Sequence, residues 1–228
     1  MTKEKYIPEV KSKLRSRIIE VPPVIYKASG IKVLGTRIKS LLFSTDVAII
    51  RNTNADAIIA VYPFTPQPII TEALMLAAQV PVFCGVGGGT TGGLRVVNLA
   101  LHAEFQGAMG VVVNAPLPNK VLVQIAQTID IPIVVTVVSD EEDIKARIDS
   151  GATILNVSGA QKTPFIVQNI RKQFPDIPII ATGGPTEETI RKTIKAGANA
   201  ITYTPPSSGE IFGGLMDKYR ETFKTENK

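Results

Sequence analysis

The chain has 228 residues and a formal net charge of +5, with 44% hydrophobic and 6% aromatic residues. This length and apolar content suit one α/β domain with a well-buried core. The basic residues are scattered and form no stripe interleaved with aromatics, which argues against a nucleic-acid surface and favours mild attraction for anionic metabolites.

The sequence also lacks the usual signals of a membrane or secreted protein. Its apolar runs are all far shorter than the roughly 18 residues that a membrane-spanning helix needs, and its basic N-terminal segment has no apolar centre typical of a signal peptide. The single cysteine, Cys84, rules out an internal disulfide and suits a reducing compartment. We therefore expect a cytoplasmic protein without nucleic-acid or membrane partners, and we allow for a homo-oligomer.

The first 39 residues differ from the rest of the chain. Residues 1–23 have the spacing of a helix that ends at a pair of prolines. Residues 24–39 read as an irregular strand pair with turns at Ser29-Gly30 and Gly35. We predict an N-terminal helix followed by a hairpin-like segment that closes the bottom of a barrel.

Residues 40–228 repeat one pattern, a short apolar run followed by a stretch with helical spacing. The runs begin alternately with a proline, as at Ile131-Pro132-Ile133, and with a Gly-Ala pair, as at Gly151-Ala152. Two such units recur roughly every 45–50 residues, in the range typical of repeat architectures. The expected strands are residues 40–45, 57–61, 82–86, 110–114, 133–138, 153–157, 179–182 and 200–204.

The near-continuous apolarity of these runs is what parallel strands covered on both faces require. Eight such strands alternating with helices predict the α/β class and a single (β/α)8 TIM barrel over residues 1–228. Asp140 and Thr186 stand where helix N-caps belong. The apolar stripe expected to face the barrel in the third βα unit consists of Leu94, Val97, Leu101 and Phe105.

Catalytic candidates follow from the barrel itself, because its site lies at the carboxyl ends of the strands. Asn114 and Asn156 end the fourth and sixth strands, where an unpaired amide among apolar residues would be costly. Contact with a ligand or a hydrogen bond between loops would explain both. Asp46 follows the first strand, but it also opens a helix, so a capping role competes with an acid/base role.

Two glycine-rich turns are candidate anion sites. Gly87, Gly88 and Gly89 lie in a segment, residues 85–93, with six glycines among nine residues. That segment could form an anion-binding nest, a mobile lid or a plain connector. Gly183 and Gly184 follow the seventh strand and precede a helix, so their backbone N–H groups could approach a phosphate.

Residues 177–201, IPIIATGGPTEETIRKTIKAGANAI, resemble the phosphate-binding TIM barrels: the ribulose-phosphate-binding group, the thiazole synthases and the FMN-binding barrels. The resemblance implies phosphate bound at Gly183 and Gly184, with Thr182 and Thr204 beside it. It also implies a catalytic acid/base role for Asp46, as in the ribulose-phosphate-binding group. One departure is that Thr204 is followed by two prolines, where these families often have a second glycine-rich turn.

The function expected is that of an enzyme acting on a small phosphorylated metabolite, of lyase, isomerase or hydrolase type. A first alternative is an FMN-binding oxidoreductase, because residues 32–39 are similar to the segment that leads into the barrel in FMN enzymes. A second alternative is a ligand-sensing barrel without turnover. A histidine or thiolate metal site is not expected, because the sequence has no paired histidines or cysteines at metal-ligand spacing.

Overall fold

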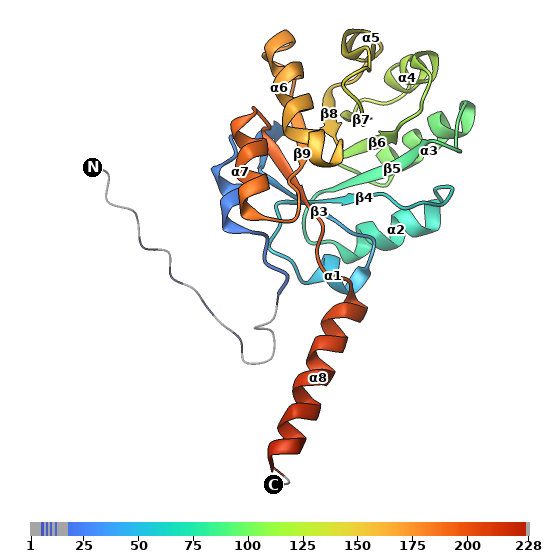
Figure 1. Cartoon of the computed structure of the whole chain (residues 1–228). Coiled ribbons are helices and arrows are strands. Elements are labelled where there is room, and N and C mark those ends of the chain that lie inside the picture. Colours follow the sequence, from blue (N-terminus) through green and yellow to red (C-terminus); the bar gives the residue numbers. More distant parts are fainter. Residues whose placement is uncertain (1–5, 7, 9, 11, 13–17, 227–228) are drawn as a thin grey trace.

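The computed structural model describes residues 6, 8, 10, 12 and 18–226. In this part of the chain eight parallel strands close into a barrel in the order β10-β3-β4-β5-β6-β7-β8-β9, with helices around it (Figure 1). The predicted α/β TIM barrel is confirmed. Its strands are β3 (Ser40–Phe43), β4 (Ala57–Ala60), β5 (Val82–Gly88), β6 (Gly110–Asn114), β7 (Ile133–Val137), β8 (Ile154–Val157), β9 (Ile179–Thr182) and β10 (Ala200–Tyr203).

Each barrel strand is followed by a helix. The first seven helices lie around the outside of the barrel, and the last one projects away from it. The helices are α1 (Val47–Arg51), α2 (Pro68–Ala77), α3 (Leu94–Phe105), α4 (Asn119–Ala126), α5 (Ile144–Asp149), α6 (Thr163–Gln173), α7 (Glu187–Lys195) and α8 (Ser208–Glu226). Short 3₁₀ helices, η1 (Pro23–Lys27) and η2 (Ala160–Lys162), precede the barrel and α6. Within the described residues, the chain has no helix with the length and apolar character needed to span a bilayer.

The hairpin predicted before the barrel is confirmed. Strands β1 (Ile31–Val33) and β2 (Thr36–Ile38) pair antiparallel around a turn at Gly35. The inner side chains Ile31, Val33 and Ile38 are buried in the same cluster as the inward-facing strand residues. The hairpin therefore plugs the amino-terminal end of the barrel with apolar side chains.

The helix predicted over residues 1–23 falls largely outside the described residues, and over residues 18–22 the prediction is wrong. There the chain is extended, and Ile19 forms a parallel bridge with Thr53. The Ile19 N–H donates to the Asn52 carbonyl at 2.7 Å, and the Asn54 N–H donates to the Ile19 carbonyl at 3.2 Å. These backbone bonds to the segment after α1 hold residues 18–22 in an extended conformation.

Two helix details also differ from the sequence prediction. The buried side of α3 consists of small residues, Val96, Val97, Ala100 and Ala103, whereas Leu94 and Phe105 are 69% and 78% exposed. Small side chains let the helix approach the strands closely, which hydrophobicity alone does not reveal. The cap of α5 is Asp143, which accepts from the Ala146 N–H, and not Asp140. Thr186 caps α7 as predicted.

Three glycines of residues 85–93, Gly85, Gly87 and Gly88, serve close packing. Strand β5 continues as far as Gly88, with a register shift after Gly85, and Gly88 lies opposite Asn114 of β6. A Cβ on Gly88 would lie 1.9 Å from the Asn114 carbonyl oxygen, and its φ is +97°. The N–H of Gly88 donates to Thr91 O at 2.8 Å, and that of Gly89 to Pro116 O at 3.0 Å. These two amides are therefore used within the protein.

We predict that Gly88→Ala lowers the free energy of unfolding by about 3 kcal/mol or more, because it combines backbone strain with a clash against backbone. Urea denaturation followed by circular dichroism measures the change. Gly92→Ala is the matched control, since a Cβ there meets nothing within 4 Å. Equal stability of the two variants would contradict this role for Gly88.

Candidate functional site

The inward-facing side chains of the barrel change from apolar to polar at its carboxyl end. Strand residues alternate between inside and outside, and the inner cluster includes Val112, Val134, Ile154, Ile180 and Ala200. Two residues further along each of these strands stands a polar side chain. We call these residues the mouth ring: Asn114, Thr136, Asn156, Thr182 and Thr202.

Hydrogen bonds link neighbours within the mouth ring, but two of its polar atoms have no partner. Thr136 Oγ1 donates to Asn114 Oδ1 at 3.3 Å, and Asn156 Nδ2 donates to Thr136 Oγ1 at 3.4 Å. Asn156 Oδ1 and Thr202 Oγ1 are buried without a hydrogen-bond partner. Since buried polar atoms in native proteins are nearly always paired, these two atoms are available to a bound water or a ligand at the mouth.

The ring is uncharged, and its other side is apolar. By the same alternation, Phe43 of β3, Val61 after β4 and Gly85 of β5 complete the circle. None of these eight positions carries an ionisable side chain. A ligand that bound over the ring would therefore meet amides and hydroxyls on one side and an apolar wall on the other.

A groove of about 860 Å³ opens beside the ring, at the ends of β9 and β10. Thr182, Gly184, Thr186, Thr202 and Thr204 are among its lining residues. The groove therefore combines three of the predicted site residues with the N-terminus of α7 and with the unpartnered hydroxyl of Thr202.

The two glycines after β9 have different roles. The Gly183 N–H donates to the Thr202 carbonyl at 3.3 Å, and a Cβ on Gly183 would lie 2.7 Å from an Ile201 methyl carbon. Gly183 is thus needed for close packing, and its N–H is used in a hydrogen bond to the neighbouring strand. Gly184 has φ +79° and faces the groove, and in the described residues its N–H makes no hydrogen bond.

The remaining predicted residues lie elsewhere on the mouth. A second cavity of about 210 Å³ on the β4–β6 side is lined by Gly87, Gly88, Gly89 and Asn114 together with Tyr62 and others. Asn114 is hydrogen-bonded to Thr136, and Thr136 to Asn156, so this row of side chains runs from the second cavity toward the groove. Seven of the predicted residues thus border two separate cavities at this end of the barrel, whereas Asn156, Gly183 and Asp46 line neither.

Asp46 borders neither cavity and is held as a helix cap. Its carboxylate accepts from the N–H groups of Ala48 at 2.9 Å and Ile49 at 3.2 Å. A hydrogen bond from the Ser208 hydroxyl, followed by those from the two N–H groups, holds the pKa of Asp46 below its ordinary value. The carboxylate therefore stays charged near neutral pH and ties the start of α1 to the start of α8.

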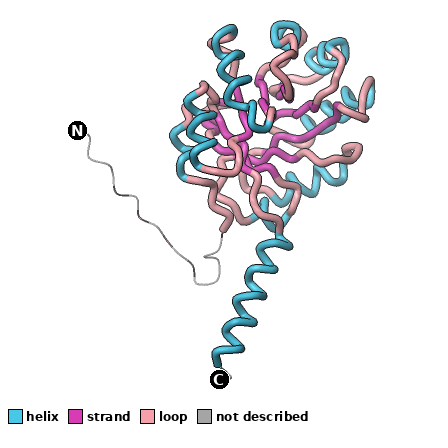
Figure 2. The backbone as a smooth tube through the Cα atoms, viewed as in Figure 1, coloured by secondary structure: helices cyan, strands magenta, loops and turns pink. Residues whose placement is uncertain are grey.

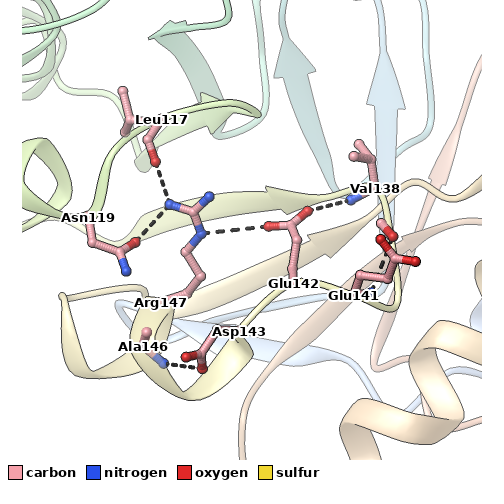
Figure 3. Close-up of polar contacts among 9 residues, drawn as sticks. Leu117, Asn119, Val138, Glu141, Glu142, Asp143, Ala146 and Arg147 are labelled. Atoms are coloured by element: carbon pink, nitrogen blue, oxygen red, sulfur yellow. Dashed lines mark hydrogen bonds and ion pairs between the residues drawn. The ribbon is translucent and has the colours of Figure 1, made fainter.

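Arg147 of α5 joins the two loops that follow β6 and β7 (Figure 3). Its guanidinium donates to the Leu117 carbonyl and, at 2.8 Å, to Asn119 Oδ1. Its Nε lies 3.6 Å from Glu142 Oε2, and the Val138 N–H donates to the other oxygen of Glu142 at 3.0 Å. Both charged side chains are mostly buried, so this link fixes the rim of the mouth next to Asn114 and Thr136.

Sequence patterns did not single out Thr202 or Arg147. Thr202 could have been found by counting two residues from the inward Ala200, because alternation along a strand is strict. Arg147 gave no such signal, since its partners Leu117 and Asn119 lie about 30 residues away.

Comparisons with known proteins support the fold. No protein-family model and no curated protein matches the sequence. Among solved structures, 2,3-dimethylmalate lyase of the PEP mutase/isocitrate lyase superfamily has a TM-score of 0.63 at 12% identity, over 90% of this chain and 86% of that one. Phosphonopyruvate hydrolase with oxalate and Mg++ has a TM-score of 0.60 at 12% identity, over 85% and 83%.

Thiamine phosphate pyrophosphorylase from Pyrococcus furiosus has a TM-score of 0.55 at 21% identity, over 72% of this chain and 84% of that one. At these identities the likeness establishes a shared barrel and does not transfer a reaction. The chain is therefore similar to enzymes of several types built on the same fold.

The residues present do not fit a metal or a flavin. Across the described part of the chain, no group of three or more His, Cys, Asp or Glu side chains could hold a metal ion. A flavin would need a cation near its ring, and the mouth ring offers only neutral groups.

We predict that Arg147→Met lowers the free energy of unfolding by about 3 kcal/mol, because it leaves the mostly buried Glu142 without its counter-charge. Thermal and urea denaturation measure the effect. Lys145→Met on the same helix is the control, because its ion pair with Asp149 is exposed to solvent and contributes little to stability. If both variants unfold alike, Arg147 does not hold the two loops together.

Proposed function

We propose that the protein is an enzyme that binds a small phosphorylated metabolite at the mouth of the barrel, of lyase, isomerase or hydrolase type. The observation that carries the proposal is the hydroxyl of Thr202, which is buried without a partner at the edge of the groove. An unpaired buried hydroxyl costs free energy, and a ligand oxygen in the groove would remove that cost.

The phosphate would sit between Gly184 and the first turn of α7. A helix N-terminus carries partial positive charge and N–H groups without intrahelical partners. The loops after the seventh and eighth strands are also the usual phosphate seat of this fold. The free N–H of Gly184 adds a donor at the same place.

Two carboxylates at the groove must be reconciled with an anionic ligand. Glu187 forms an ion pair with Arg191 at 3.2 Å, which offsets its charge. Glu210 accepts from the N–H and the hydroxyl of Ser207, both at 2.7 Å. Both carboxylates are therefore engaged with partners of their own, and the net charge of +5 favours anions over the whole molecule.

The rest of the substrate would lie over the mouth ring. The unpartnered Asn156 Oδ1 can accept from a substrate hydroxyl, and Asn114 and Thr136 hold the Asn156 amide in place. Two of the similar structures, phosphonopyruvate hydrolase and thiamine phosphate pyrophosphorylase, are named after phosphorus-containing compounds. These names agree with a phosphorylated ligand for this protein. Asp46 is the acid/base candidate near this end of the barrel.

A second candidate function is a ligand-sensing barrel without turnover. It is favoured by the neutral mouth ring and by the lowered pKa of Asp46, since a proton-transfer group works best with a pKa near the working pH. Binding of phosphorylated metabolites without conversion would distinguish this function from the enzyme.

We predict that Thr202→Val weakens the binding of inorganic phosphate, or of a phosphorylated metabolite found by screening, about tenfold or more. The change keeps the side-chain shape and removes one hydrogen bond to a charged ligand, which is worth about 1.5–3 kcal/mol. Isothermal titration calorimetry measures the affinity. Stability should hold or rise, because the variant also removes an unpaired hydroxyl.

Thr71→Val is the matched control, because Thr71 is a nearly buried threonine on α2, outside the groove. It should bind phosphate as the wild type does. Wild-type affinity in Thr202→Val would remove the main support for the phosphate site.

We predict that Asp46→Asn reduces turnover about 100-fold or more if Asp46 is the acid/base group. The cap supplies a second readout. Because the folded pKa of Asp46 is lowered, its carboxylate stabilises the protein above the unfolded pKa, and this contribution is lost as the pH falls through the folded pKa. The melting-temperature difference between wild type and variant should therefore shrink from pH 7 toward pH 3.

Asp143→Asn serves as the control, since Asp143 caps α5 in the same way. It changes a capping carboxylate in the same way and should leave turnover unchanged. Full turnover in Asp46→Asn would leave Asp46 with the capping role alone.

A further inference from the structure

Helix α8 leaves the barrel and projects into solvent (Figures 1 and 2). The reason lies at the other end of the chain. Val21, Val24 and Ile25 are at most 3% exposed and belong to the same core cluster as Leu42 of β3 and Ile201 of β10. The segment before the barrel, with η1 against α7, thus covers the seam between β10 and β3 where an eighth helix would pack.

The projecting helix carries an apolar stripe along one side. Ile211, Leu215 and Tyr219 recur every four residues, and Phe212 and Met216 lie beside them. Phe212 is 65% exposed and Tyr219 is 51% exposed. Only the first part of the stripe touches the barrel, since Ile211 packs against the core cluster.

Such a helix is poorly stable without a partner. Gly213 and Gly214 stand in its interior, and each costs about 1 kcal/mol relative to alanine. Isolated helices of about this length are marginal in water, and most helical stability in proteins comes from packing of an apolar face. The stripe therefore requires a cover that the chain's own barrel does not supply.

A shallow apolar groove of about 460 Å³ lies at the base of the helix. It joins the start of the stripe to the outer side of α1, so one continuous apolar surface runs from the barrel onto α8. Its lining residues are Ile18, Ile19, Ala48, Ile49, Asn52, Ser208, Ile211, Phe212 and Leu215.

The charges of α8 argue against a membrane as the cover. The helix has three basic residues, Lys218, Arg220 and Lys224, and four acidic ones, Glu210, Asp217, Glu221 and Glu226. Helices that lie on anionic membranes have a predominantly basic polar face. A face with both signs is instead complementary to an identical face that runs in the opposite direction.

We propose that α8 is a dimerisation arm that lays its apolar stripe over the base groove and the α8 stripe of a second copy of this chain, about a two-fold axis. In such an interface each contact occurs twice. Phe212 and Tyr219 are 65% and 51% exposed, so each can bury a little over half of the roughly 150–250 Å² of an aromatic side chain. The stripe, the base groove and the barrel surface around it would together supply the ~800 Å² per partner that is typical of stable interfaces.

The first test is the mass of the full chain in solution, measured by light scattering during size-exclusion chromatography at micromolar concentrations. The wild type should elute at twice the chain mass of 24.5 kDa. Tyr219→Asp should be monomeric and lose helical circular dichroism, because the uncovered arm unfolds while the barrel keeps its melting transition. Gly214→Asp is the control, since it adds the same charge to α8 at a position that does not neighbour Tyr219 on the helix surface and where a Cβ meets nothing within 4 Å.

A second measurement needs no variant. Amide hydrogen exchange in residues 211–219 of the wild type should slow as protein concentration rises, because dimerisation protects the arm. A monomeric wild type, concentration-independent exchange, or a dimer that persists in Tyr219→Asp would overturn the proposal. A monomer that binds phosphatidylserine vesicles through α8 would overturn it in favour of a membrane.

Discussion

Closure of the parallel sheet is the constraint on which the rest of the structure depends. Pairing of β10 with β3, in which Ile201 lies opposite Ser40 and Thr202 opposite Leu41, leaves no free edge in the barrel. Once closed, every strand must point alternate side chains into one shared interior. The hairpin of β1 and β2 seals the amino-terminal end with Ile31, Val33 and Ile38. The carboxyl end is therefore where polar inward side chains can meet a ligand.

The carboxyl end of the barrel combines neutral polar side chains with a turn at Gly184 whose positive φ favours glycine. Asn114, Thr136 and Asn156 form a connected row, whereas Thr202 faces the groove with its hydroxyl unpaired. The adjacent Gly184 and the start of α7 supply N–H donors and partial positive charge. Because the ring holds no ionisable side chain, any proton transfer must involve a group outside it. Asp46, the proposed acid/base group, is one such group, and it borders neither cavity.

The segment before the barrel and the last helix compete for the same place on the outer face of the barrel. Residues 18–27 pack where the last helix of the ring would lie, held by backbone bonds between Ile19 and the segment after α1. Consequently α8 begins beside α1, where Ser208 bonds to the Asp46 carboxylate, and then departs from the barrel. One carboxylate thus caps α1 and anchors the arm, so changes at Asp46 can reach α8 as well as the mouth.

The sequence by itself determined the barrel, the bounds of its eight strands to within two residues, the hairpin and the Thr186 cap. These features depend on local patterns: apolar runs, turn residues and capping side chains near the backbone groups they bind. Only the tertiary structure decided the rest. Whether Gly88 is a lid or a close contact depends on Asn114 of the neighbouring strand. Which side of α3 is buried depends on the strands beneath it. The path of residues 18–22 and the departure of α8 depend on competition between the two chain ends for one surface, which no local pattern encodes.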